Sequence, residues 1–394
     1  MINRFKAYGF LKNLKFFEPY LIIFLINKNI SFTLIGTLFS IRFLTTWFFE
    51  VPSGIIADIY SKKKALLFSI SCYMVSFFIF YISKDLLFLS LAMFVFGIGE
   101  AFRSGTHKGI IMDYLHDINE IENTHTYYSS TRSYSMLGSS LNALISIFII
   151  LSRPDLSMLF LFSIFPYFLC FLLLLSYPEN KKSKTISIKR QIKLFFLELK
   201  DFFRTRGIID YAMSDAFYKS LKEYIQPVII LSVPVCGAFL SKQGMKNINI
   251  GIVYFFLNLI NAYSAGMSKK IKSISKENIH IILKRFGYLM FLTILLCSIF
   301  LYFRITFMPV LFFILMYVIY NLRKPVFISY FSIYTSADQR TSVLSAASFI
   351  SVLISSAVAP LIGFFADIYS VPVSLMMIST MYMISYFFIS VRRI

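Results

Sequence analysis

Ionisable side chains stand inside long apolar stretches of this chain, and their spacing indicates what chemistry they could do. Glu100 and Arg103 are one helical turn apart, so they share one face of a helix. Asp215, Lys219 and Glu223 recur every fourth residue and share a face in the same way. A charge inside a membrane is costly unless it is paired or wetted, and such groups mark solute pathways or proton relays. We therefore expect these side chains to face a polar cavity.

Two more charged residues in apolar stretches, Glu18 beside Pro19 and Arg42, are expected in the same cavity. A second interpretation stays open for the whole set, because internal ion pairs can simply hold helices together. Lys219 could satisfy Asp215 on one side and Glu223 on the other. Proton coupling would need a carboxylate whose affinity for protons differs between two states, and the candidates are Glu18, Glu100, Asp215 and Glu223.

The amino-acid composition indicates which class of protein positions these groups. Of 394 residues, 58% are apolar and 15% are charged, which excludes a soluble globular enzyme, a disordered chain and a disulfide scaffold. The apolar runs are continuous rather than alternating, which argues against an outer-membrane barrel. The cysteines form no metal or redox pattern, so we expect no metal and no cofactor. These cysteines are Cys72, Cys170, Cys236 and Cys297.

Twelve apolar runs are each long enough, or nearly so, to cross a membrane as a helix. They are 9–27, 32–57, 64–82, 86–112, 128–152, 157–177, 207–233, 248–267, 281–303, 306–322, 341–366 and 371–391. The basic segment 178–206 divides them six and six. We therefore predict an all-helical membrane protein with an N-terminal half at 1–177, a linker at 178–206 and a C-terminal half at 207–394.

The formal net charge of +20 is explained by where the basic residues lie in the chain. Lysine and arginine concentrate in alternate segments, including Lys62 to Lys64, the linker, and Arg323 with Lys324, as the positive-inside rule expects of cytoplasmic loops. This pattern predicts both termini in the cytoplasm, and it leaves little charge for nucleic-acid binding. Residues 188–203 have apolar residues at helical spacing, which predicts an amphipathic helix on the inner leaflet. A plain basic tether is the alternative.

The sequence EVPSGIIADIYSKKK, from Glu50 to Lys64, resembles the GxxxDxxGR[KR] loop of the major facilitator superfamily. Gly54 and Asp58 match that signature, and Lys62 and Lys63 match it in charge. The resemblance implies a twelve-helix transporter in which this loop forms an inner gate. In such a gate Asp58 would sit against the N-terminal end of the helix that opens near Thr341.

Two shorter stretches extend the resemblance. Arg103, followed by small residues, is similar to a family motif linked to proton coupling, whereas the GPxxGG motif of antiporters is absent from 128–152. The segment GFFADIYS, from Gly363 to Ser370, repeats GIIADIYS at six of eight positions. In a fold of inverted repeats these segments would be equivalent, so Asp367 is a candidate outer latch.

The resemblance implies a secondary transporter that moves a small solute by alternating access. We expect proton-coupled export of a drug-like or metabolite substrate and a location in a bacterial inner membrane, because the loop is similar to that of bacterial exporters. Abundant Phe and Tyr would suit an apolar cation. The alternatives are a proton-coupled importer and a lipid-linked saccharide flippase. Histidines form no recognisable catalytic pair and no phosphate-binding GxxxxGK[ST] loop is present, so we expect neither an enzyme nor an ATPase. We expect a monomer whose partners are its solute, protons and membrane lipids.

Overall fold

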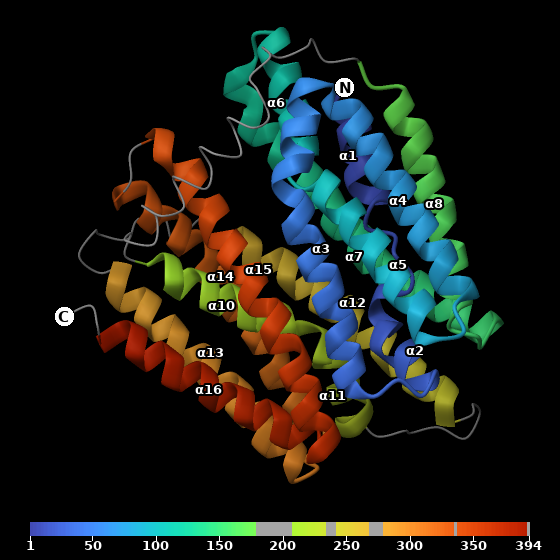
Figure 1. Cartoon of the computed structure of the whole chain (residues 1–394), viewed down its shortest axis with the longest axis vertical. Helices are drawn as coiled ribbons and strands as arrows, with labels where there is room; N and C mark the ends of the chain where they lie inside the picture. The colour runs from blue at the N-terminus through green and yellow to red at the C-terminus, as the bar shows by residue number, and fades with distance from the viewer. Residues whose placement is uncertain (179–206, 234–241, 268–278, 335–336, 392–394) are drawn as a thin grey trace. The chain divides into compact units, whose positions relative to one another are not determined.

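The computed structural model describes residues 1–178, 207–233, 242–267, 279–334 and 337–391, and the regular elements of this part of the chain are helices (Figure 1). The helices are α1 (Ile2–Leu11), α2 (Leu21–Asn27), α3 (Phe32–Ile59), α4 (Lys62–Ile82), α5 (Leu86–Arg103), α6 (Thr106–Asp117), α7 (Thr124–Ser152), α8 (Met158–Leu175), α10 (Ile208–Leu221), α11 (Ile225–Ser232), α12 (Lys242–Met267), α13 (Ile279–Tyr302), α14 (Met308–Tyr334), α15 (Ala337–Ile368) and α16 (Val371–Val391). Short 3₁₀ helices are η1 (Glu18–Tyr20), η2 (Ile121–Asn123) and η3 (Lys222–Tyr224). The predicted amphipathic helix at 188–203 and Cys236 lie outside the described residues.

The chain divides into two compact units. Of the described residues, unit 1 contains 1–24, 41–178 and 251–258, and unit 2 contains 25–40, 207–233, 242–250, 259–267, 279–334 and 337–391. Helix α3 therefore begins in unit 2 and continues in unit 1. In unit 1, α4 packs closely against α5 and α8, and α1 packs against α7. In unit 2, α10 packs against α15, and α13 packs against α14 and α16.

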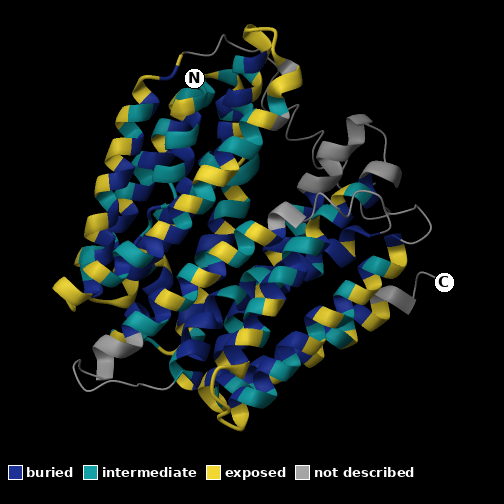
Figure 2. Cartoon of the chain, turned by 180° about the vertical axis from the view of Figure 1, so that it is seen from behind, coloured by how far each residue is buried: buried dark blue, intermediate teal, exposed yellow. Residues whose placement is uncertain are grey.

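Each of the twelve predicted apolar runs coincides with one helix or with two successive helices. Nine helical stretches of the described chain are long and apolar enough to cross a membrane, counting α5 and α6 as one stretch, and Glu18–Asn27 is a shorter apolar stretch. Buried and exposed positions alternate along the helices (Figure 2), and large apolar side chains such as Phe68, Phe148 and Phe165 are exposed. Exposed apolar side chains at this density suit contact with lipid. The multi-pass helical fold is therefore confirmed.

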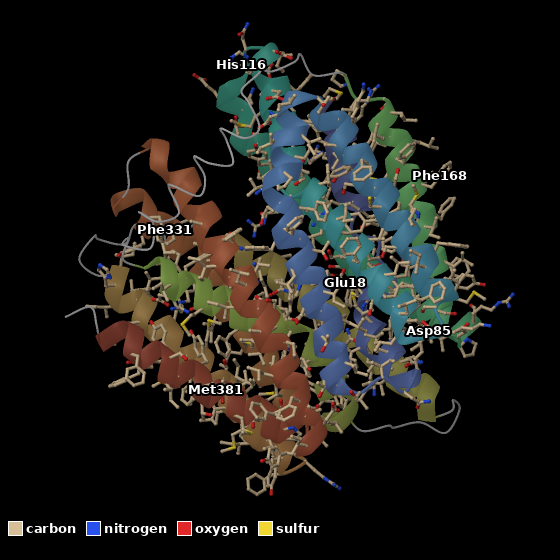
Figure 3. The ribbon with its side chains drawn as sticks, in the orientation of Figure 1. Glu18, Asp85, His116, Phe168, Phe331 and Met381 are labelled. Carbon is tan, nitrogen blue, oxygen red and sulfur yellow. The ribbon has the colours of Figure 1, made fainter. Side chains whose placement is uncertain are left out.

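Three of the runs are interrupted where the sequence places charges. The break between α1 and α2 contains Glu18 in η1 (Figure 3), and the break between α10 and α11 contains Glu223 in η3. Between α5 and α6, Arg103 is the last residue of α5 and Gly105 adopts a φ of 73°, a left-handed conformation that a residue with a Cβ rarely takes. Interrupted helices leave backbone groups unpaired, which suits a polar environment inside a membrane protein.

Two boundaries differ from the sequence prediction. The run expected at 306–322 continues as α14 to Tyr334, so Arg323 and Lys324 belong to a helix and not to an inner loop. Arg323 is 1% exposed, and its burial is possible because it forms an ion pair within unit 2. Helix α15 begins at Ala337, four residues before Thr341, where the sequence predicted a helix start.

Candidate functional site

Glu100 lies between two arginines in unit 1. One carboxylate oxygen is 3.9 Å from Nε of Arg42 on α3, and the other is 3.9 Å from Nη2 of Arg103 on α5. The Glu100 side chain is 33% exposed, against 10% for Arg42 and 28% for Arg103. Three of the predicted cavity residues are thus brought together. Contacts of this length and exposure are weak, so the carboxylate can change partners.

The Arg103 side chain is held by a hydrogen bond to a tyrosine. Its Nε donates a hydrogen bond of 3.0 Å to the hydroxyl of Tyr73 on α4, a residue that is fully buried. The guanidinium retains further N–H groups that this bond does not use. Arg103 is therefore held in place while part of its charge remains available to a partner.

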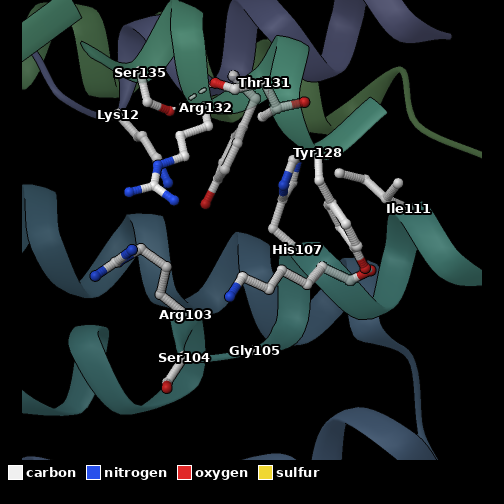
Figure 4. A pocket seen from close by; sticks show the side chains of 12 residues that line it. Lys12, Arg103, Ser104, Gly105, His107, Ile111, Tyr128, Thr131, Arg132 and Ser135 are labelled. Carbon is white, nitrogen blue, oxygen red and sulfur yellow. Dashed lines mark hydrogen bonds between the residues drawn. The ribbon is translucent and has the colours of Figure 1, made fainter. Parts of the chain in front are cut away.

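Arg103 also lines a cavity of about 580 Å³ in unit 1. Four basic side chains from different helices contribute to its wall: Lys12 after α1, Arg103 from α5, Lys108 from α6 and Arg132 from α7. Figure 4 shows Lys12 and Arg132 on the side opposite Arg103. No aspartate or glutamate is among the described residues that line it. The sequence prediction did not single out Lys12, Lys108 or Arg132 for this site.

Aromatic and hydroxyl groups complete the wall. The ring of His107 stacks on that of Tyr8, with 3.9 Å between the centroids and 16° between the planes. Nε2 of His107 lies 3.3 Å from the hydroxyl of Tyr177, whose pKa is raised by burial. Thr131 and Ser135 of α7 and Tyr128 add hydroxyl groups. The cavity thus combines positive charge, hydroxyl donors and flat apolar surfaces.

The loop with the family signature forms contacts within unit 1. Nζ of Lys62 lies 2.9 and 3.0 Å from the two carboxylate oxygens of Asp113 on α6, and 3.8 Å from Asp58. Ser61, where the family has glycine, caps α4 by accepting a hydrogen bond from the backbone N–H of Lys64. Asp113 is a partner that the sequence analysis missed, since only the spatial proximity of α4 and α6 brings it to Lys62.

Lys63 has a different role from Lys62. Its ammonium donates hydrogen bonds to the backbone carbonyls of Leu175 and Tyr177, at 2.8 and 2.6 Å, where α8 ends. Arg4 contributes a third such bond, to the carbonyl of Ser176. Basic side chains at a helix C-terminus satisfy its last carbonyls and oppose the helix dipole. At Gly54, an added Cβ would meet no heavy atom of the described residues within 4 Å.

Asp215 forms the polar centre of unit 2. Its side chain is 2% exposed, and Nζ of Lys219 lies 2.6 Å from it. It accepts hydrogen bonds from the hydroxyls of Tyr320 on α14 and Ser351 on α15, and Lys324 lies 4.0 Å away. The expected pair of Asp215 and Lys219 is present, and it links α10 to α14 and α15.

A second buried ion pair in unit 2 was not expected. Nη2 of Arg323 lies 2.7 Å from Oδ1 of Asp210, and both side chains are 1% exposed. Arg323 also donates to Ser214 and to the hydroxyls of Tyr382 and Tyr386. Because Arg206 lies four residues before Asp210 and could pair with it on a helix, the sequence contains no signal that points to Arg323.

Two other predicted residues have separate surroundings. Glu223 in η3 has a side chain that is 10% exposed, and it lies 3.4 Å from Nζ of Lys222 and not beside Lys219. Glu18 is exposed at the start of η1. Glu223 is therefore paired with Lys222 rather than with Lys219, and Glu18 is not one of the residues in the ion pairs that join Arg42, Glu100 and Arg103.

Asp367, near the end of α15, contacts the first turn of α3 within unit 2. Its carboxylate accepts hydrogen bonds from the backbone N–H of Phe32 at 2.9 Å and of Thr33 at 2.7 Å, and from the Thr33 hydroxyl at 2.6 Å. A carboxylate at this position satisfies N–H groups that have no partner within the helix. One turn earlier in α15, Gly363 allows the close approach, because an added Cβ would lie 2.0 Å from the carbonyl oxygen of Phe32.

These features define a helical membrane protein with charged side chains buried inside two helical units. The family model of the Major Facilitator Superfamily matches residues 13–360, so the chain belongs to this superfamily of transporters. A crystal structure of a mutant of the nucleoside transporter NupG is similar to it, with a TM-score of 0.77, 12% identity and coverage of 100% of both chains.

A crystal structure of a POT family transporter in complex with 5-aminolevulinic acid has a TM-score of 0.74 and 14% identity, with coverage of 99% of this chain and 95% of the other. At such identities the likeness concerns the fold alone. Comparison with curated protein sequences gives no significant match. The predicted twelve-helix fold of the superfamily is thus confirmed.

Proposed function

We propose that this transporter moves a small solute by alternating access and couples the movement to protons through Glu100. The observation that carries the proposal is that Arg103 contacts Glu100 and also lines the cavity. A solute that engages Arg103 weakens the attraction between this arginine and Glu100. The protonated form of Glu100 then becomes more favourable, because a nearby positive charge is what stabilises the carboxylate.

Solute and proton favour each other's binding in this scheme, and the effect is reciprocal by thermodynamic necessity. A carrier that binds both together moves both in the same direction, so an inward proton gradient drives uptake. Export of a drug-like or metabolite solute is the second candidate, and the observation that favours it is the similarity of the loop from Glu50 to Asp58 to that of bacterial exporters.

Alternating access would have the halves at 1–177 and 207–394 rock against each other around the bound solute. We assign the inner gate to Gly54, Asp58, Lys62 and Lys63, and an outer latch to Asp367. The abundance of basic residues in alternate loops supports an orientation with both termini in the cytoplasm. The similarity of the loop from Glu50 to Asp58 to that of bacterial exporters supports a bacterial inner membrane as the location. We expect it to act as a monomer surrounded by lipid.

The test uses purified protein in proteoliposomes that contain a pH-sensitive dye. Anionic, zwitterionic and cationic metabolites are added one at a time without a pH gradient. A solute that enters with protons acidifies the lumen, and an inward proton gradient should then concentrate it. Glu100→Gln, which cannot release a proton, should abolish both effects while counterflow exchange of the same solute continues.

Glu122→Gln is the matched control, since Glu122 is exposed in η2 and lies outside the cavity lining. It should behave as wild type. Unchanged acidification in Glu100→Gln would remove Glu100 from the coupling step. If whole cells that make the protein retain less of the solute than cells without it, and a protonophore cancels the difference, export replaces uptake.

A further inference from the structure

The cavity that contains Arg103 has an unbalanced charge. Lys12, Arg103, Lys108 and Arg132 contribute four cations, and no carboxylate is among the described residues of the wall. Side chains of like charge that converge on one space repel each other, and the repulsion is relieved by a ligand of opposite charge. A wall with acidic side chains in place of the basic ones would suit a cationic solute instead.

Two of the four cations have no partner within the described part of the chain. Neither the ammonium of Lys108 nor the guanidinium of Arg132 makes a hydrogen bond or ion pair there, although the backbone carbonyl of Lys108 accepts one from Tyr128. Arg103 is partly used by Tyr73 and Glu100. Lys12 lies over the ring of Tyr8, with 5.6 Å from Nζ to the centroid. The charge of this site is therefore available to a ligand.

We propose that the cavity binds a small organic anion, with a carboxylate or phosphate group between Arg103 and Arg132 and its remaining part against the rings of Tyr8 and Tyr128. Guanidinium groups match the geometry of both oxyanions by donating two parallel hydrogen bonds. The hydroxyls of Thr131 and Ser135 supply further donors. A volume of about 580 Å³ is within the range of sites for small organic molecules.

This inference rests on the proposed function, because it names the solute class that engages Arg103. It replaces the apolar cation expected from the aromatic content of the sequence. It also explains why proton coupling would be useful. An anion entering a cell with a negative interior moves against the membrane potential, and a co-transported proton cancels that charge.

The first test measures binding alone, with purified protein in nanodiscs of phosphatidylcholine. Isothermal titration calorimetry is carried out with phenyl phosphate, benzyl alcohol and benzylamine, which share a ring and differ in charge. Phenyl phosphate should bind at least tenfold more tightly than the other two. Arg132→Gln and Lys108→Gln should each weaken it about tenfold, and Arg132→Lys should weaken it less, because it keeps the charge but loses the planar contact.

The control is Lys84→Gln, which removes an exposed cation outside the cavity and should bind as wild type. Arg132 and Lys108 are both exposed, so their variants should keep the wild-type melting temperature. Equal binding of benzylamine and phenyl phosphate, or unchanged binding in both variants, would overturn the proposal.

A second arm separates a solute from the head group of an anionic lipid, which has the same chemistry. The titration is repeated in nanodiscs that contain phosphatidylglycerol. Unchanged affinity for phenyl phosphate supports a solute site. Competition by phosphatidylglycerol, together with anionic lipid that co-purifies with the wild type but not with Arg132→Gln, would assign the cavity to lipid and overturn the solute proposal.

The two proposals fail in different ways. Anion binding without proton-linked transport in proteoliposomes would leave this inference in place and remove the proposed coupling. Proton-linked transport of a neutral or cationic solute, with no binding of phenyl phosphate, would leave the proposed coupling in place and remove the anion site.

Discussion

The carboxylate of Asp367 binds the first turn of α3 through Thr33, accepting hydrogen bonds from both its backbone N–H and its hydroxyl. The contact joins the end of α15 to the start of a helix that continues from unit 2 into unit 1. It combines a cap with a negative charge at the positive end of a helix dipole. We therefore expect it to stabilise one conformation of the transporter more than the other.

The first prediction concerns Asp367→Asn. Loss of the charge and of part of the cap should cost about 1–2 kcal/mol in the state that contains the contact, which is roughly a five- to thirtyfold change in the population ratio. Spin labels at Arg153→Cys and Ile305→Cys, in a background without native cysteines, report the populations through their distance distribution. The distribution should move away from the wild-type maximum.

Asp85→Asn is the control for this measurement. Asp85 caps α5 by accepting a hydrogen bond from the backbone N–H of Phe88, so it has the same local chemistry without joining two distant helices. It should lower stability by a similar amount and leave the distance distribution unchanged. An unchanged distribution in Asp367→Asn as well would refute the outer latch.

The second prediction compares two glycines of the repeated GxxxD motif. Gly363→Ala should destabilise the protein by about 1–3 kcal/mol, because the new methyl group would overlap the backbone of Phe32. Gly54→Ala should leave stability unchanged or raise it by up to about 1 kcal/mol, because the space is open and alanine favours a helix. Thermal unfolding in detergent measures both. The proposed inner gate adds that Gly54→Ala should still reduce transport, and destabilisation by Gly54→Ala would contradict the packing described here.

Local signals explain how far the sequence prediction succeeded. The apolar runs, the basic loops and the GxxxD motifs depend on neighbours in the chain, so the helices and the pairing of Asp215 with Lys219 were predictable from spacing. The grouping of Lys12, Lys108 and Arg132 was not, because it arises from the packing of α1, α6 and α7. Each of these cations resembles a membrane-edge lysine or arginine when it is seen alone.

Arg323 illustrates the opposite error. With Lys324 and Pro325 beside it, it resembles a cytoplasmic loop, and the positive-inside rule supported that interpretation. Its partner Asp210 is more than a hundred positions away in the chain, so only the tertiary structure reveals that the charge is neutralised inside unit 2. A single sequence contains no signal that distinguishes a buried paired arginine from an exposed one at a membrane edge.

The third prediction tests this pair. Asp210→Ala should cost about 3–5 kcal/mol, because it leaves the guanidinium of Arg323 buried without its counter-ion. The double variant Asp210→Leu with Arg323→Met should recover most of that loss, since well-packed apolar residues often replace a buried ion pair at little cost. Thermal unfolding of the purified single and double variants measures both effects. A double variant as unstable as the single one would mean that Tyr382 and Tyr386 depend on Arg323 for their own packing.

The last prediction separates Glu100 from Asp215 by function. Glu100 has partners at 3.9 Å on a side chain that is one-third exposed, so Glu100→Gln should change stability by less than about 1 kcal/mol. Asp215 is 2% exposed and lies 2.6 Å from Nζ of Lys219, so Asp215→Asn should cost about 1.5–3 kcal/mol by weakening charge-assisted hydrogen bonds of a buried carboxylate. Thermal unfolding and proton-linked uptake are measured on the same preparations. We expect Glu100→Gln to lose coupling while it keeps its stability, and Asp215→Asn to lose stability first.

Uptake in Asp215→Asn, compared at equal amounts of folded protein, should still respond to a pH gradient. Loss of that response with intact stability would transfer the proton-carrying role from Glu100 to Asp215.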